Sequence, residues 1–154
     1  MPRYWLMKSE PYEISIDDLE AASGQVLQWT GVRNYQARNF MRDEMRIGDG
    51  VLFYHSSCAE PGVAGLARIA GKPCPDPTQF DPSSAYHDPK ATADKPRWVQ
   101  IDVALTRKTQ LLTLREMRAA PELATMRVLA PGNRLSITPV TPEEWRAVSH
   151  LLAR

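Results

Sequence analysis

Alternation of apolar and polar residues is clearest in residues 98–107. The apolar members stand at every second position: Val99, Ile101, Val103 and Leu105. Because successive side chains of a strand point to opposite faces, this pattern predicts a strand with one face in the core. Trp98 falls on the polar face by the same count. An indole at such a position needs a reason, and a ligand surface is one.

Shorter apolar runs predict further strands. They lie at residues 4–7, 51–54, 63–69 and 134–138, and an extended run at residues 25–28 leads to Trp29. The first run is followed by Lys8, Ser9 and Glu10, and the run at 51–54 by His55 and Ser56. Both strands are therefore expected to end in polar groups that include a serine.

Helical spacing and capping signals account for most of the remaining chain. In residues 34–45 the apolar side chains recur at steps of three and four, and this spacing predicts an amphipathic helix. The apolar residues are Ala37, Phe40, Met41 and Met45. Ser15 before an acidic first turn predicts a second helix. Thr113 and Thr141, each with a glutamate three residues later, predict two more. Pro121 opens a further helical turn.

Residues 72–96 are rich in proline and polar residues and show little periodicity. A long segment of this kind in a compact domain is usually functional or disordered. Phe80, Tyr86 and His87 within it favour an ordered lid that packs on the domain. We find no repeat and no domain boundary, so residues 1–154 are expected to form a single α+β domain. Its mixed sheet would curl into a barrel with helices outside.

Composition restricts the class of protein. The chain has 43% hydrophobic and 24% charged residues, as in ordinary soluble domains, and its formal charge is only +1. Such a charge argues against binding that relies on neutralising many phosphates, so a local pocket would have to supply selectivity for nucleic acid.

Several classes of site and location are not expected. Two cysteines, Cys58 and Cys74, cannot form a disulfide framework. His55 and Cys58 have a spacing that metal sites use, but no second pair of ligands at comparable spacing completes a tetrahedral site. We expect no metal and no cofactor. No apolar run reaches the length of a membrane span, and charged residues at the N-terminus argue against a signal peptide. These features predict a cytoplasmic monomer with no membrane partner.

Residues 29–40 carry the densest candidate chemistry. An indole, a hydroxyl and a glycine precede a predicted helix whose start holds two arginines and two asparagines. Arg33 and Asn34 fall near the helix start, where free N–H groups and the dipole favour an anion. The segment is suited to hold a flat polar ligand beside a phosphate. The alternative is that Trp29 and Tyr35 are core residues and the arginines are solvated.

Several motifs together resemble the EVE domain, a branch of the PUA-like superfamily. They are Tyr4-Trp5-Leu6-Met7-Lys8-Ser9-Glu10-Pro11, Trp29-Thr30-Gly31-Val32-Arg33-Asn34-Tyr35-Gln36-Ala37-Arg38-Asn39-Phe40, Phe53-Tyr54-His55-Ser56, residues 60–66, residues 80–89, Pro96-Arg97-Trp98 and Arg134-Leu135-Ser136-Ile137. The resemblance spans nearly the whole chain. It implies a PUA-like pseudo-barrel of mixed strands flanked by helices, and a relation to YTH domains, which hold methylated adenine in an aromatic cage.

The resemblance also implies a ligand and residue roles. The ligand would be DNA or RNA with a modified base, commonly a modified cytosine, that is single-stranded or flipped out of its duplex. In the implied base pocket, Trp29 is the cage tryptophan and Thr30 its hydroxyl neighbour, while Asn34 and Ser9 contact the Watson–Crick edge of the base. Trp98, with Tyr35 or Phe80, would close the cage. His55 and Ser56 would line the pocket. Lys8, Arg33 and Arg38 would take phosphates. Core roles for Trp29 and Trp98, and a structural role for His55, remain the alternatives.

The leading hypothesis from the sequence is a non-catalytic reader of modified bases. A second hypothesis is an enzyme acting on a modified nucleoside such as acetylcytidine, because some ASCH-like relatives use a lysine and a glutamate, and Lys8 and Glu10 lie close together in the sequence. No catalytic constellation supports it further. A third hypothesis is a module that binds a small molecule or a peptide.

Overall fold

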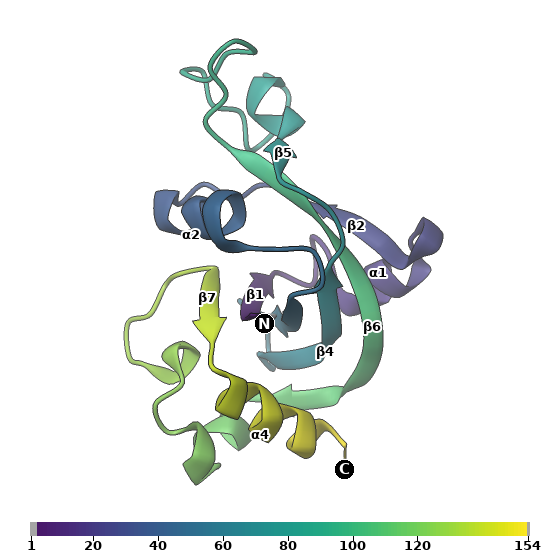
Figure 1. Ribbon diagram of the computed structural model, residues 1–154, viewed down its shortest axis with the longest axis vertical. Helices are drawn as coiled ribbons and strands as arrows, with labels where there is room; N and C mark the ends of the chain where they lie inside the picture. The colour runs from purple at the N-terminus through teal and green to yellow at the C-terminus, as the bar shows by residue number, and fades with distance from the viewer. Residues whose placement is uncertain (1–2, 154) are drawn as a thin grey trace.

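A mixed sheet of seven strands lies at the centre of the computed structural model, which describes residues 3–153 (Figure 1). The main path of the sheet runs β2-β6-β4-β3-β1-β7, and β5 pairs with β6 beside it. The strands are β1 (Tyr4–Ser9), β2 (Val26–Trp29), β3 (Gly50–His55), β4 (Gly62–Ile69), β5 (Cys74–Pro75), β6 (Val99–Thr113) and β7 (Ile137–Val140). Strands β1 and β3 run parallel, and the other pairs are antiparallel. The α+β class and the mixed sheet flanked by helices are confirmed.

The sheet is not closed into a barrel, which corrects that part of the prediction. Strand β2 pairs with β6 and β7 pairs with β1, and these two short strands remain the edges in the described residues. Strand β6 extends over 15 residues, further than its alternating pattern predicts, and follows a long curve past β4 (Figure 1).

Strand β1 continues two residues beyond its apolar run because its pairing with β3 continues. The parallel register reaches Ser9 opposite His55, and the backbone N–H of Ser56 then donates to the carbonyl of Ser9 at 3.0 Å. Both strands end in polar groups, as their sequences predicted, and the parallel pairing places these ends side by side. The ends of these two interior strands form one wall of the site described below.

Two apolar clusters cover the faces of the sheet. Trp5 and Met7 of β1 join the cluster under α1 and α2, while Leu6 between them joins the cluster that includes α3 and α4. The helices are α1 (Ile16–Ala21), α2 (Tyr35–Asn39), α3 (Leu114–Arg118) and α4 (Pro142–Leu152), with single turns at η1 (Ser23–Gln25), η2 (Phe40–Glu44), η3 (Pro77–Phe80), η4 (Pro121–Leu123) and η5 (Arg127–Leu129). The period-two alternation of a strand thus supplies both layers of core.

The helix predicted for residues 34–45 changes its winding along the way. It is α-helical in α2 and becomes a π-helical turn in η2. All four apolar residues that predicted it are buried. The capping boxes predicted at Thr113 and Thr141 are both present.

The predicted loop at residues 72–96, called the arm below, extends from the sheet beside β5 and holds η3 (Figure 1). Its only strand among the described residues is the two-residue β5, which pairs with the start of β6. Strand pairing and the buried Asp76 and Gln79 tie the arm to the domain. The prediction of an ordered segment is therefore confirmed.

Candidate nucleic-acid interface

A cavity of about 700 Å³ opens where β1 ends. Its lining residues come from four segments, with Ser56 and Ser57 beside them: Lys8, Ser9, Glu10, Glu13 and Ile14; residues 29–34 after β2; Tyr86 of the arm; and Asn133, Arg134 and Ser136 before β7. The volume falls within the range of pockets that enclose a small ligand. We refer to it below as the cavity.

The structure brings seven of the predicted site residues to the cavity. They are Lys8, Ser9, Trp29, Thr30, Arg33, Asn34 and Ser56. Five others do not line it: Tyr35, Arg38, His55, Phe80 and Trp98. The cavity also has lining residues that the pattern did not single out for the base pocket, and four of them carry ionisable groups: Glu10, Glu13, Tyr86 and Arg134.

Trp29 belongs to the core and to the cavity wall together. It is 8% exposed, and its ring meets the edge of Phe53 with centroids 5.4 Å apart. The chain then turns at Gly31, where φ is +79° and a Cβ atom would lie only 3.0 Å from the Tyr86 ring, so both the backbone and the space require glycine. This turn lets the arm approach closely enough for Tyr86 to form a wall near Trp29.

Tyr86 is the aromatic residue that the arm contributes to the cavity. Its phenol donates to the two carboxylate oxygens of Glu13 at 2.7 and 2.8 Å. Burial, this hydrogen bond and the charges of Glu13 and Glu10 raise the pKa of Tyr86 to about 12. Phe80, which the sequence proposed for the cage, does not reach the cavity. The sequence marked both as packing residues of the arm but contained no signal for which one faces inward.

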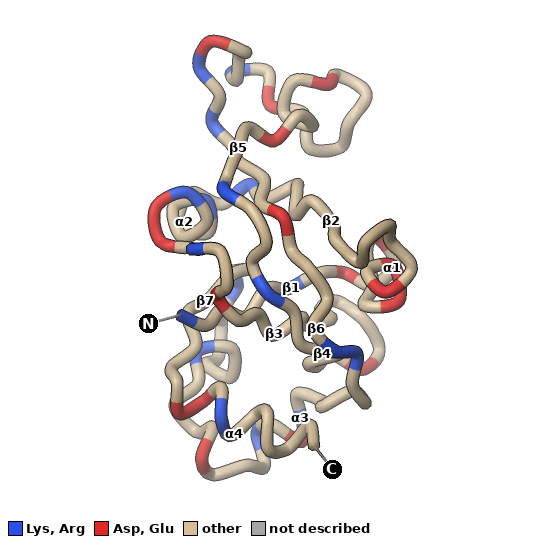
Figure 2. The backbone as a smooth tube through the Cα atoms, turned by 45° about the vertical axis from the view of Figure 1, so that its right-hand side comes forward, with Lys and Arg blue, Asp and Glu red and all other residues tan. Residues whose placement is uncertain are grey.

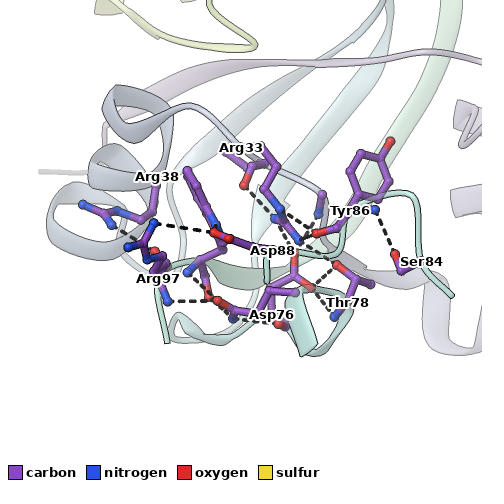
Figure 3. Close-up of polar contacts among 12 residues, drawn as sticks. Arg33, Arg38, Asp76, Thr78, Ser84, Tyr86, Asp88 and Arg97 are labelled. Carbon is purple, nitrogen blue, oxygen red and sulfur yellow. Dashed lines mark hydrogen bonds and ion pairs between the residues drawn. The ribbon is translucent and has the colours of Figure 1, made fainter. Parts of the chain in front are cut away.

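The guanidinium of Arg33 is fully engaged within the protein (Figure 3). Its Nε and one terminal nitrogen donate to the Tyr86 carbonyl, and the remaining N–H groups donate to the Val32 carbonyl, Asp76 and Thr78. A guanidinium has five N–H donors, and all five have partners here. The structure therefore uses Arg33 to join the arm to the segment after β2, although its side chain also lines the cavity, and its predicted role as a phosphate ligand stays a prediction.

Asp76 is the counterpart of Arg33 and is completely buried. One of its oxygens accepts from the Gly31 backbone at 2.8 Å and from Arg33 at 3.2 Å, and the other accepts from the backbone and hydroxyl of Thr78. A buried carboxylate is stable when its charge is paired and its oxygens are hydrogen-bonded. Asp76 thus fixes the glycine turn beside Trp29.

Trp98 packs within the protein next to the arm and α2, and does not line the cavity. It is 5% exposed, its indole N–H donates to Asp88 at 2.8 Å, and its ring stacks on Tyr35 at 4.8 Å. Arg38 lies over the Tyr35 ring at 4.7 Å and donates to Asn39 and to the Arg97 carbonyl. The expectation that Trp98 and Tyr35 close a cage, with Arg38 on a phosphate, does not match these positions, because partners within the protein hold all three away from the cavity.

His55 and Asn34 have structural partners as well. His55 Nε2 accepts the backbone N–H of Ile16 at 3.1 Å at the start of α1, and burial lowers the pKa of His55. This hydrogen bond fits the structural role that the sequence left as the alternative for His55. The Asn34 side-chain oxygen caps α2 by accepting from Ala37 at 3.0 Å. Its amide nitrogen makes no hydrogen bond within residues 3–153, so Asn34 keeps a donor at the cavity.

Lys8 and Arg134 are the cations of the cavity that lack a partner. Neither the ammonium of Lys8 nor the guanidinium of Arg134 makes a hydrogen bond or an ion pair with the described residues. Burial lowers the pKa of Lys8. Along the rest of the backbone, acidic and basic positions are interspersed (Figure 2). Lys8 and Arg134 are therefore the cavity cations that have no partner among the described residues and could meet an anion.

Comparison with known proteins identifies relatives of this chain. Residues 3–151 match the sequence profile of the EVE domain. The human protein "Thymocyte nuclear protein 1" is 41% identical over a region covering 96% of this chain and 73% of that protein. The structure of human THYN1 protein in complex with 5-methylcytosine containing DNA superposes with a TM-score of 0.91 at 40% identity, covering 99% of this chain and 98% of that one. The YTH domain of Zygosaccharomyces rouxii MRB1 protein shares the fold alone, with a TM-score of 0.60 at 12% identity, over 99% and 85% of the two chains.

These relatives overturn the prediction of a cytoplasmic location. The human relative has the name of a nuclear protein. The sequence features behind the prediction were the lack of a signal peptide and of a membrane span, and these features do not distinguish cytoplasm from nucleus. In residues 3–153 no helix combines the length and the apolar character needed to cross a membrane.

Proposed function

This chain belongs to the EVE domain family, and we propose that it is a non-catalytic module that binds nucleic acid by enclosing one modified base, with 5-methylcytosine as the first candidate. The observation that carries this proposal is the cavity itself, in which Trp29 and Tyr86 provide aromatic surface beside Lys8 and Arg134, two cations without a partner in residues 3–153. Stacking on aromatic side chains contributes roughly 1–3 kcal/mol per base. The human relative solved with DNA containing 5-methylcytosine supports the choice of ligand.

A base that enters the cavity has to leave its stack. A duplex would pay an unpairing cost of a few kcal/mol, which a single strand avoids. Selectivity for the methyl group arises from the apolar surface that it covers, about 0.8 kcal/mol per buried carbon group, or roughly a fourfold difference in affinity. We therefore infer that a single strand binds more tightly than a duplex and that discrimination by the methyl group alone is modest.

The proposal predicts tighter binding to a methylated strand. We expect a short single strand with one 5-methylcytosine to quench the tryptophan fluorescence of the protein at an approximately fourfold lower concentration than its unmodified twin. The same titration with hydroxymethylcytosine and methyladenine strands ranks the modifications. Equal binding of all strands would contradict recognition of a modification. Turnover of acetylcytidine that is lost in Lys8→Ala would instead favour the enzymatic hypothesis, because Lys8 and Glu10 both line the cavity.

Arg134 offers a second prediction, since we propose that this arginine, whose donors have no partner among the described residues, contacts a phosphate. Arg134→Ala should weaken binding to methylated and unmethylated strands by the same factor, and should lower the slope of log K against log salt by about one. Arg107→Ala is the matched control, because Arg107 is an exposed arginine of β6 that does not line the cavity. A loss confined to the methylated strand would place Arg134 on the base rather than on a phosphate.

A further inference from the structure

The cavity contains carboxylates that binding of a polyanion does not require. Glu10 and Glu13 both line it, together with Lys8 and Arg134. No ion pair joins either carboxylate to these cations within residues 3–153. An uncompensated carboxylate repels a phosphate, so its presence in the cavity suggests contact with a different part of the ligand.

Glu13 is the carboxylate that a residue of the cavity wall, Tyr86, holds in position. The phenol of Tyr86 donates to both of its oxygens, and the Tyr86 ring packs against Gly31, two residues beyond Trp29. Glu10 instead accepts from Tyr12, which is 74% exposed and does not line the cavity. Glu13 is therefore the better positioned of the two to meet the edge of a base that stacks on Trp29.

The state of Tyr86 defines what Glu13 can accept. With its pKa at about 12, the Tyr86 phenol keeps its proton at neutral pH and remains the donor in this contact. An ionised carboxylate has about four lone-pair positions and donates nothing, and the phenol occupies at most one position on each oxygen. Glu13 thus retains acceptor capacity for a donor on the ligand.

Building on the proposed function, we propose that Glu13 accepts a hydrogen bond from the exocyclic amino group of the enclosed base. The cavity then prefers amino-bearing bases, the derivatives of cytosine and adenine, over thymine and uracil. A glutamate accepting from the amino group of cytosine is a favourable pairing in nucleic-acid recognition. Thymine would present a carbonyl oxygen to the carboxylate, and two acceptors facing each other lose the hydrogen bond and repel.

The test compares two strands that differ in one base, 5-methylcytosine or thymine. These bases share the methyl group and a similar stacking surface. They differ at position 4, which carries an amino group in 5-methylcytosine and a carbonyl in thymine, and at N3, which is an acceptor in 5-methylcytosine and an N–H donor in thymine, so the Glu13 variant is needed beside the base comparison. We expect the wild-type protein to bind the 5-methylcytosine strand about tenfold more tightly. In Glu13→Gln the preference should fall to within about twofold, because an amide can rotate to donate or to accept. Tyr86→Phe keeps the ring but releases Glu13, and should retain an intermediate preference.

Controls separate this inference from the proposed function. Glu20→Gln, an exposed change on α1 away from the cavity, should retain the wild-type preference. If the wild-type protein binds 5-methylcytosine more tightly than cytosine but thymine equally well, the reader function stands and the inference fails. If neither strand binds, the proposed function fails and takes the inference with it. A preference that survives Glu13→Gln but disappears in Glu10→Gln would overturn the assignment to Glu13.

Discussion

Trp29→Ala is expected to weaken binding of the 5-methylcytosine strand by about 10- to 100-fold, because it removes the aromatic surface on which we propose that the base stacks. The strand should carry a fluorescent label, and its anisotropy should be followed, since the substitution also removes an intrinsic tryptophan. Loss of affinity should appear for unmodified strands as well, because every base has a face that can stack.

A second variant keeps this prediction testable. Trp29 also packs on Phe53 in the core, so Trp29→Ala is expected to lower the free energy of unfolding by about 3 kcal/mol. Trp29→Phe retains a ring and should recover part of the affinity. Circular dichroism establishes that both variants are folded at the temperature of the titration. Wild-type affinity in the folded alanine variant would show that the base does not stack on Trp29.

Asp76→Ala is expected to have the largest effect on stability, lowering the free energy of unfolding by about 3–5 kcal/mol. The substitution removes the partner of the Arg33 guanidinium and leaves the Gly31 backbone N–H without its acceptor. The guanidinium of Arg33 would then be partly buried without its anionic partner. The loss of folding free energy exceeds the net contribution of the ion pair, because the desolvation of the remaining charge is no longer offset. Urea unfolding followed by circular dichroism measures the change, and binding should weaken because the glycine turn beside Trp29 loses its anchor.

Asp43→Ala is the matched control for this prediction. Asp43 also pairs with an arginine, Arg42, but both side chains are about half exposed, at 52% and 47%. Solvent screens such a pair, so the urea midpoint should remain at the wild-type value. Equal destabilisation by the two substitutions would show that burial of Asp76 does not determine its contribution.

Local patterns alone predicted much of the secondary structure. The alternation in residues 99–105, the three- and four-residue steps in residues 37–45 and the capping boxes at Thr113 and Thr141 each depend on side chains close together in the sequence. Such patterns act over one or two turns or a single strand, so they survive without knowledge of the fold. These patterns did not predict the change to a π-helical turn in η2 or the length of β6. Both features depend on tertiary packing and strand pairing.

The membership of the cavity was predicted only in part. The sequence placed Lys8, Ser9 and Ser56 at the ends of two predicted strands. The parallel pairing of β1 with β3 brings these strand ends together at the cavity. Glu13, Tyr86 and Arg134 come from separate loops, and no periodicity relates residues so far apart in the chain. Their meeting depends on the path of the arm and of the segment before β7.

The sequence by itself determined which chemical groups were available: an indole followed by a glycine turn, an excess of donors near a helix start, and polar ends on neighbouring strands. Only the tertiary structure decided which of these groups remain free to meet a ligand. Arg33 and Arg134 illustrate the difference, since both are arginines in family motifs. Partners 43 to 53 residues away, together with the neighbouring Val32 carbonyl, engage every donor of Arg33, whereas Arg134 has no partner among the described residues. A hydrogen-bonding group is available for binding only when the fold has not already satisfied it, and that property belongs to the packed molecule rather than to the residue.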